Sequence, residues 1–121
     1  MRKPPSEPAA PDPSARRSPC PVACALDLVG DRWTLLLVRD LLAGKTRFNE
    51  LRASPEKIPS NILADRLKRL ERGGILTAVP YERRPLRVQY LLTPKGRALG
   101  RVLQALATWG LEYLPGTSWS H

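Results

Sequence analysis

Residues 59–92, PSNILADRLKRLERGGILTAVPYERRPLRVQYLL, change periodicity once, and that change decides the fold. Up to Arg72, apolar residues recur every three or four positions, which predicts a helix over 59–72. The apolar stripe consists of Leu67 and Leu70 together with either Ile62 or Leu63. Two glycines end this helix, and from Leu86 to Leu92 apolar side chains alternate with others, as is typical of a β-strand. A helix is therefore followed at once by a β-hairpin.

The expected hairpin pairs the β-prone run 75–81 with a strand over 86–92. The turn between the strands contains Arg83, Arg84 and Pro85, and Arg87 follows on the second strand. Proline restricts the turn because its ring fixes one backbone dihedral angle. The sequence thus predicts a stiffened tip that carries three arginines.

Two helices on the N-terminal side are expected to build the core. The first begins at Pro21, directly after Cys20, and ends before Gly30. Asp31 is a suitable N-cap for the second helix, over 32–43, because its side chain can accept hydrogen bonds from backbone N–H groups. Apolar residues cover most of the circumference of this second helix, which places it at the centre of the core.

A third helix of barely two turns is expected after Thr46, which can serve as its N-cap. Phe48 and Leu51 face inward, and Pro55 prevents the helix from continuing. The N–H groups and the dipole at the start of a helix attract anions. We therefore expect a phosphate to bind at this helix start, near Lys45, Thr46 and Arg47.

The last helix is expected to begin at Thr93 and Pro94 and to run as one long helix to about Tyr113. Its apolar side chains are more numerous than a core of this size covers. We expect this helix and the first one to form an isologous two-fold dimer interface; the alternative is that they wrap only their own core. The predicted interface residues are Leu99, Leu103, Leu106, Trp109 and Tyr113.

Composition divides the 121 residues into three parts. Seven of the thirteen prolines fall within the first 21 residues, so 1–19 is predicted to be a disordered Pro-rich tail. Residues 20–115 are expected to form one folded domain, and 116–121 a flexible C-terminus. The apolar runs are too short for a bilayer-spanning helix, and the Pro-rich start lacks the apolar core of a signal peptide. A cytoplasmic location is therefore expected.

Few side chains are suited to catalysis or to metal binding. The single histidine is the last residue, His121, and two cysteines lack the remaining ligands for a closed zinc site. The sequence contains no recognisable Ser-His-acid set, paired-carboxylate signature or phosphate-cradling glycine loop. The sequence therefore argues against an enzyme, and we expect no cofactor and no metal.

The charge of the chain is strongly positive and is concentrated in its centre. The net charge is +9, and residues 45–101 contain fourteen basic and five acidic side chains. One interpretation is a solvated surface with scattered charges. The clustering on particular elements instead favours a polyanion as partner.

Two helices joined by a short connection and followed by an arginine-tipped hairpin are the pattern of a winged helix-turn-helix. The predicted fold class is mainly α with a small β-hairpin wing, dimerising through the N- and C-terminal helices. In this fold the helix 59–72 enters the major groove, and the wing 81–87 contacts the backbone or minor groove. A two-fold dimer presents two such helices about 34 Å apart to a pseudo-palindromic operator.

The predicted DNA contacts come from three elements. Asn61 is suited to pair with an adenine edge, and Ser60 is suited to a base or a phosphate. Asp65 either accepts from a cytosine amino group or pairs with Arg69 one turn later. The remaining predicted contacts are Lys45, Thr46, Arg47, Lys68, Arg69, Arg83, Arg84 and Arg87, which are suited to phosphates or, for the wing arginines, also to the minor groove.

Together these motifs resemble the HxlR family of bacterial transcriptional regulators over roughly residues 20–109. The matching segments are Cys20-Pro21, Leu26, Gly30 to Thr34, Arg39 to Leu41, Arg47 to Leu51, Leu63 to Leu70, Tyr90, Leu92 to Pro94 and Gly96. Members are homodimeric, MarR-like winged-helix proteins that repress or activate nearby genes. The resemblance implies a nucleoid-associated homodimer whose partner is double-stranded DNA, with a small molecule or an oxidant as a candidate effector.

The sequence departs from the family pattern where DNA would be read. Family members often open the recognition helix with a serine and carry polar or basic residues along its outer face. Here Pro59 occupies the opening, and Ala64 and the acidic Asp65 lie on the expected outer face. The base preference of the family therefore does not transfer to this chain.

Cys20 and Cys24 are candidates for redox sensing. Cys20 stands at the expected N-cap, where the helix dipole favours the reactive thiolate, and some HxlR members sense oxidants or electrophiles through a cysteine at the matching position. Residues one turn apart have Cβ atoms about 5–6 Å apart, beyond the spacing of an unstrained disulfide. A bond between subunits or alkylation is therefore easier. The alternative is that both cysteines are small buried residues at the dimer interface.

Two other functions are compatible with a basic winged helix. The domain could be a protein-interaction module whose arginines dock on an acidic partner without sequence-specific DNA binding. RNA binding is less favoured, because the predicted hairpin does not interleave aromatic residues on a sheet surface. Binding to heparin and to nonspecific DNA at low salt distinguishes the DNA-binding function from the protein-interaction function.

Overall fold

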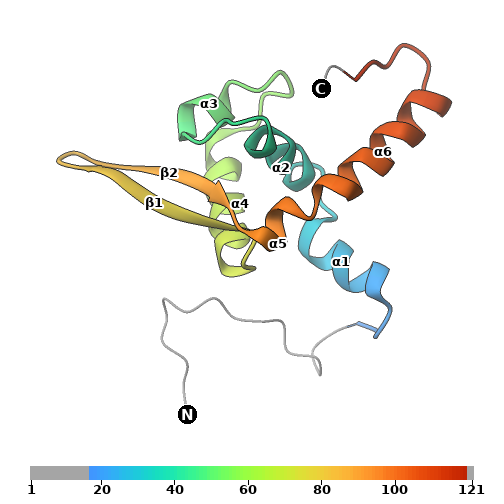
Figure 1. Cartoon of the computed structure of the whole chain (residues 1–121), viewed down its shortest axis with the longest axis horizontal. Helices are drawn as coiled ribbons and strands as arrows, with labels where there is room; N and C mark the ends of the chain where they lie inside the picture. Colours follow the sequence, from blue (N-terminus) through green and yellow to red (C-terminus); the bar gives the residue numbers. More distant parts are fainter. Residues whose placement is uncertain (1–16, 120–121) are drawn as a thin grey trace.

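The structure, a computed structural model, describes residues 17–119, which form helices around a two-stranded antiparallel sheet (Figure 1). In chain order the elements are α1 (Pro21–Val29), α2 (Thr34–Leu42), α3 (Phe48–Arg52), α4 (Ser60–Arg72), β1 (Leu76–Arg83), β2 (Leu86–Leu92), α5 (Pro94–Arg97) and α6 (Gly100–Tyr113). The hairpin projects from one side of the body, and α1 and α6 project from the other (Figure 1). This architecture confirms the predicted winged helix-turn-helix class. Most of the predicted tail 1–19, and residues 120–121 of the predicted C-terminal segment, lie outside the described residues.

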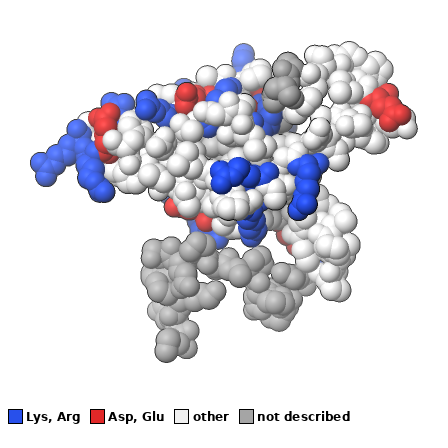
Figure 2. Space-filling view, viewed as in Figure 1, with Lys and Arg blue, Asp and Glu red and all other residues white. Residues whose placement is uncertain are grey.

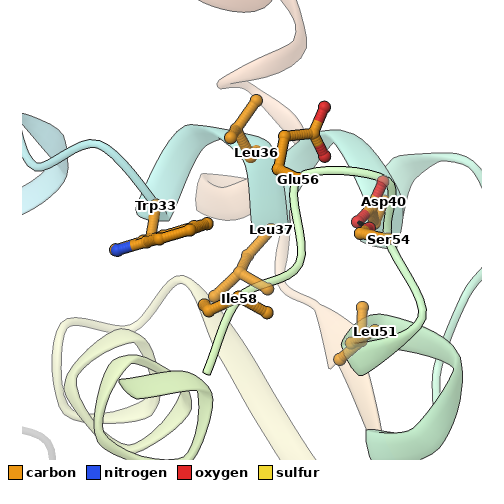
Figure 3. A pocket seen from close by; sticks show the side chains of 8 residues that line it. All are labelled: Trp33, Leu36, Leu37, Asp40, Leu51, Ser54, Glu56 and Ile58. Carbon is orange, nitrogen blue, oxygen red and sulfur yellow. Dashed lines mark hydrogen bonds between the residues drawn. The ribbon is translucent and has the colours of Figure 1, made fainter. Parts of the chain in front are cut away.

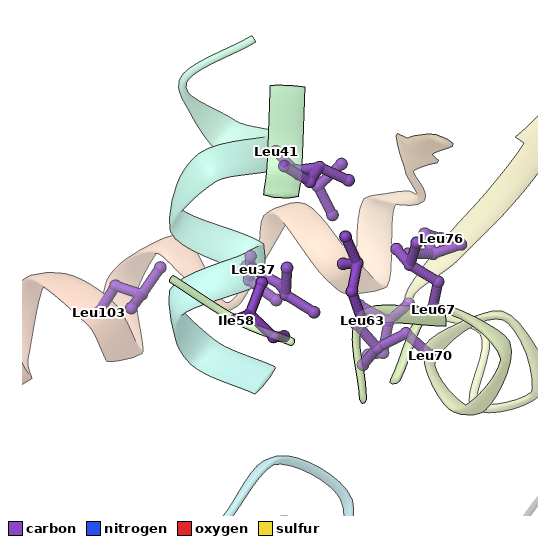
Figure 4. Packing of buried hydrophobic residues seen from close by; sticks show 11 residues of the cluster. Leu37, Leu41, Ile58, Leu63, Leu67, Leu70, Leu76 and Leu103 are labelled. Carbon is purple, nitrogen blue, oxygen red and sulfur yellow. The ribbon is translucent and has the colours of Figure 1, made fainter. Parts of the chain in front are cut away.

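The second helix, α2, lies at the centre of the hydrophobic core, as predicted. Its Leu37, Val38 and Leu41 are buried in the same hydrophobic cluster as the stripe of α4, which consists of Leu63, Leu67 and Leu70. Leu63 therefore completes this stripe, whereas Ile62 is only partly buried. Figure 4 shows Leu76, from the start of β1, beside Leu67 and Leu70. Burial of each such leucine stabilises the fold by about 2 kcal/mol, so this packing fixes α4 in the core, in contact with β1 and α3.

The junction between α1 and α2 differs from the prediction. Helix α1 has the predicted bounds, with Cys20 as N-cap and Gly30 as C-cap. Helix α2 begins two residues later than expected, and its N-cap is Trp33 rather than Asp31. The Asp31 carboxylate accepts hydrogen bonds from the Trp33 N–H at 3.2 Å and from the Thr34 hydroxyl. These bonds hold 31–33 in a turn, so the residues cannot form the first helical turn.

The hairpin is longer than expected, because β1 extends to Arg83 and the turn contains only Arg84 and Pro85. The register pairs Leu76 with Leu92 and shifts between Pro80 and Glu82. This irregularity is a β-bulge at Tyr81, which bends and twists the outer half of the hairpin. The outer half of the hairpin, which carries the tip, therefore points in a different direction from the half that is attached to the body.

The predicted long last helix is instead divided into α5 and α6. The Thr93 hydroxyl accepts a hydrogen bond from the Gly96 N–H at 3.1 Å, which confirms Thr93 as the N-cap of α5. The Leu99 N–H then bonds the Gly96 carbonyl three residues back, so the chain tightens and breaks the α-helix. Gly96 packs so closely that a Cβ there would lie 2.1 Å from the Ile75 carbonyl oxygen. Because α5 is fixed against the base of the hairpin, α6 starts anew and ends at Tyr113, as predicted.

Candidate nucleic-acid interface

The outward face of α4 is polar and exposed, opposite the buried leucine stripe. The exposed residues of this face include Ser60, Asn61, Ala64, Asp65 and Lys68. Pro59 is the N-cap and has no side-chain oxygen with which to cap the helix, and the first turn contains no acidic residue. The N–H groups at the start of this 13-residue helix therefore stay available for an anion. The predicted position of Asn61, Ala64 and Asp65 on the outer face is confirmed, although Arg69 is half-buried.

Asp65 has a different partner from the one expected. Its Oδ2 accepts a hydrogen bond from an Arg66 guanidinium nitrogen at 2.5 Å, so the predicted pair with Arg69 was wrong. The side chain of Arg66 leaves the outer face of α4 and reaches the α1–α2 junction, where its Nε donates to Asp31 at 2.8 Å. Sequence reasoning missed Arg66 because helical spacing considers neighbours one turn apart and not an adjacent residue that is turned aside by a distant carboxylate.

The Asp31 carboxylate is held by three donors. Partial burial alone would raise its pKa, but hydrogen bonds from Thr34, Arg66 and the Trp33 amide outweigh burial and lower the pKa of Asp31 to about 2. The carboxylate is therefore ionised at neutral pH and forms a charge-assisted pair with Arg66.

A carboxylate of the protein itself already binds the N–H groups at the start of α3. Glu50 accepts hydrogen bonds through Oε1 from the backbone N–H groups of Thr46 and Arg47, at 3.1 and 3.0 Å. These bonds lower the pKa of Glu50. The N-cap is Arg47 rather than Thr46, so the predicted Thr46 cap was wrong. The position of a glutamate three residues after the N-cap is a capping-box signal that could have revealed Glu50 in the sequence.

Arg47 joins the start of α3 to the wing. Its guanidinium lies 4.2 Å from the centroid of the Tyr81 ring, and the Tyr90 N–H bonds the Thr46 carbonyl at 2.7 Å. Between these elements lies an open groove of about 490 Å³. The groove is lined by Arg47, Phe48, Asn49, Glu50, Tyr81, Leu86, Arg87 and Val88. The wing and α3 thus form one surface with basic groups along it.

The wing arginines are exposed. Arg83, Arg84 and Arg87 all face solvent, and Arg87 lies 4.0 Å from Glu82 in a weak ion pair. Figure 2 shows Lys and Arg gathered at the end of the molecule that the hairpin forms. Their charges are therefore free to meet a polyanion at the wing tip.

The connection between α3 and α4 is held on α2. Arg39 donates to both carboxylate oxygens of Glu56, at 2.9 and 2.7 Å, and to Asp40 at 3.0 Å. Asp40 is buried and also accepts the hydroxyl of Ser54, which faces it in Figure 3. The pocket drawn there has a volume of about 10 Å³, which has room for about one water molecule and not for an effector. This network fixes the turn that orients α4.

The two cysteines differ in environment. Cys20 is exposed at the N-cap of α1, and Cys24 is partly buried, with its thiol donating to the Ser18 carbonyl at 3.4 Å. Both thiols are free in the structure.

Apolar side chains remain uncovered on α1 and α6. Leu103 is buried in the core of its own chain and Leu99 packs against that core, so these two predicted interface residues have little surface left for a partner. The exposed apolar residues of the two helices are Val22, Leu26, Val102, Leu106, Trp109, Leu111 and Tyr113. Figure 1 shows that α1 and α6 project on the side away from the wing. Among the described residues, no helix has the length and apolar character needed to cross a bilayer.

Comparison with known proteins gives consistent matches. A family model described as HxlR-like helix-turn-helix matches residues 28–118. The HTH-type transcriptional regulator YdeP of Bacillus subtilis (strain 168) is 39% identical over 94 residues, which cover 78% of this chain and 73% of YdeP. Mycobacterial relatives are longer, and this chain spans 59% of their length.

Two solved structures have similar folds. PA1607, described as a putative transcription factor, has a TM-score of 0.76 and 44% identity, covering 89% of this chain and 75% of PA1607. The redox regulator HypR in its reduced form has a TM-score of 0.71 and 34% identity, covering 77% of this chain and 92% of HypR.

Proposed function

We propose that this chain, which belongs to the HxlR-like helix-turn-helix family of transcriptional regulators, binds a pseudo-palindromic operator at the nucleoid as a homodimer. The observation that carries the proposal is the exposed polar face of α4, held rigidly by its leucine stripe and flanked by a wing with three exposed arginines. An α-helix fits the major groove of B-DNA, and planar arginine heads fit phosphates and the narrow minor groove.

Within this proposal α4 reads bases. Asn61 pairs with an adenine edge, and Ser60 and the N–H groups after Pro59 contact a phosphate or a base. Lys68, one turn beyond Asp65 on the exposed face, contacts a phosphate. Arg69 is half-buried, so only its guanidinium end reaches the DNA backbone.

The wing and the start of α3 supply phosphate contacts. Arg83, Arg84 and Arg87 contact the DNA backbone or its minor groove. Lys45 and Arg47 contact the DNA backbone beside the protein groove between α3 and the wing. Because Glu50 already occupies the N–H groups of Thr46 and Arg47, the side-chain charges rather than the helix start attract the phosphate. Thr46 contributes through its hydroxyl.

Dimerisation uses the uncovered apolar faces of α1 and α6. Burial of Leu106, Trp109 and Tyr113 against a second copy removes large apolar side chains from water, each now about half exposed or more. The rings of Trp109 and Tyr113 already contact each other, with centroids 5.5 Å apart and planes tilted by 42°, and form a pre-ordered aromatic patch. A two-fold dimer of this kind places the wings at its outer ends.

The experiment that tests the proposed function is footprinting on the DNA upstream of the chain's own gene, together with sedimentation. We expect two protected half-sites one helical turn apart and a dimer at micromolar concentration. The variant Asn61→Ala should lower operator affinity roughly tenfold while leaving nonspecific binding unchanged. Absence of binding to heparin and to nonspecific DNA at low salt would reject DNA binding and leave the protein-interaction function.

A thiol input is a second element of the proposal, supported by the exposure of Cys20 at the start of α1 and by the similarity to the redox regulator HypR. Diamide takes up two thiol hydrogens and leaves one disulfide, here between the Cys20 thiols of the two subunits. Either this bond or alkylation of Cys20 would alter the dimer helix, with Cys24 one turn further along it. Diamide should lower operator affinity for the wild type and not for Cys20→Ser. Equal affinities with and without diamide would reject the thiol input and leave operator binding intact.

A further inference from the structure

Charged hydrogen bonds link three side chains in a row, from the α1–α2 junction to the outer face of α4. Asp31 accepts from Arg66 Nε at 2.8 Å, and another nitrogen of the same guanidinium donates to Asp65 at 2.5 Å. The exposed fractions of the side chains are 22% for Asp31, 21% for Arg66 and 57% for Asp65. This row of bonds thus begins at a partly buried carboxylate and ends on the exposed face of α4.

Asp31, at the inner end of this row of bonds, is held in place. The Trp33 N–H and the Thr34 hydroxyl also bond Asp31, so its carboxylate has little freedom to turn. Arginine presents several N–H donors in one rigid plane, and here two of them bond different carboxylates. The direction of Asp65 therefore depends on the plane of Arg66, which in turn depends on Asp31.

A carboxylate on a DNA-binding face is useful only where it meets a donor, because phosphates repel it. In the major groove the donors are the amino groups of cytosine and adenine, and an acidic side chain suits cytosine N4. The bond to Arg66 uses Oδ2 of Asp65 and leaves Oδ1 as an acceptor. Arg66 also offsets part of the repulsion between Asp65 and the DNA backbone.

We infer that Arg66 and Asp31 are positioning residues that hold the Asp65 carboxylate for selection of a cytosine in each half-site. This inference rests on the proposed operator binding and deepens it. The guanidinium of Arg66 lies between Asp31 and Asp65 and is engaged by both carboxylates, so Arg66 acts on the DNA only through Asp65. The base preference of α4 is thereby coupled to the junction that follows α1.

The test is selection of a randomised double-stranded DNA library by the full chain, with base preference read at every position. Asp65→Asn should lower the preference for cytosine roughly tenfold at one position of each half-site. Arg66→Lys keeps the charge but loses the planar fork, and Asp31→Asn keeps the size but loses the charge. Both should lower the preference severalfold at that same position. The matched control is Asp27→Asn on α1, whose carboxylate pairs only with Arg17 among the described residues and should change no position.

The outcomes separate the inference from the function it rests on. A position-specific loss shared by Asp65, Arg66 and Asp31 variants supports the inference, since a purely structural role would weaken binding to all sequences alike. Unchanged cytosine preference in Arg66→Lys and Asp31→Asn, or in Asp65→Asn, overturns the inference while the wild type still selects an operator. A wild type that selects no sequence overturns the proposed function and the inference together. The unfolding free energy of each variant, measured in parallel, identifies any variant that does not fold, and Arg66→Lys then decides the result.

Discussion

The guanidinium of Arg47 lies over the ring of Tyr81, 4.2 Å from its centroid, and this contact links the start of α3 to the bulged part of the wing. The hairpin has only two strands, and such hairpins are marginally stable without support from the body. The contact therefore helps to set the angle of the wing relative to the body, and with it the approach of the wing to DNA in the proposed complex.

The first prediction follows from this contact. Tyr81→Ala should lower the free energy of unfolding by about 1 kcal/mol and speed hydrogen exchange in the hairpin, because a partly exposed cation–π pair contributes about that amount. Tyr81→Phe keeps an aromatic face and should behave like the wild type. Denaturant titration and amide exchange measure both effects. Equal exchange rates in the wild type and Tyr81→Ala would show that Arg47 does not support the wing.

The second prediction is that Asp31 makes the free energy of unfolding depend on pH in acid. The folded pKa of Asp31 is lowered to about 2, below its value of 3.8 in an unfolded chain, so its bonds stabilise the fold above about pH 4 and are lost as the pH falls toward 2. Asp31→Asn should therefore be less stable than the wild type by about 1–2 kcal/mol at pH 7, after allowance for solvent screening. The difference should shrink as the pH falls below about 4 and approach zero only below pH 2. Denaturant titrations across this range, in which a constant difference contradicts the assignment, provide the check.

The third prediction separates the two acids that share Arg39. Asp40 is 4% exposed, so Arg39→Met leaves a buried carboxylate without its cation and should cost about 2–4 kcal/mol. Glu56 lies nearer the surface, and Glu56→Gln should cost about 1 kcal/mol or less. Thermal or denaturant unfolding of the two variants measures the contrast. Equal costs would mean that Asp40 does not depend on Arg39.

The order and type of the elements could be predicted because they depend on local periodicity. Leu67, Leu70 and the alternation from Leu86 to Leu92 are properties of neighbouring residues, and the structure confirms the helix and the strand that they predict. The start of α2 and the division at Leu99 could not be predicted. Asp31 bonds Trp33 and Thr34 in its own turn and also Arg66, 35 residues away, and α5 is held by the close approach of Gly96 to Ile75. The contacts with Arg66 and Ile75 join residues far apart in the sequence, which local periodicity does not report.

In the candidate interface, too, local patterns predicted some features and missed those that depend on distant contacts. The exposure of Asn61 and of the wing arginines followed from the helical and hairpin patterns. Arg66 was missed because its partner Asp31 is 35 residues away, and Tyr81 was missed because its bulge depends on strand register. Leu103 was assigned to a dimer interface, but it fills the space between α6 and α2 in its own chain. Helical periodicity shows which residues are apolar and not which of two hydrophobic surfaces buries them.

The dependence of operator affinity on salt tests the central claim most directly. If each subunit neutralises about four phosphates, the slope of log affinity against log salt for the wild-type dimer should be near −7. Arg83→Ala removes one such contact per subunit and should bring the slope to about −5, whereas Arg101→Ala, on the exposed surface of α6, should leave it unchanged. A wild-type slope between −1 and 0, or a slope that Arg83→Ala does not alter, would contradict DNA binding through α4 and the wing.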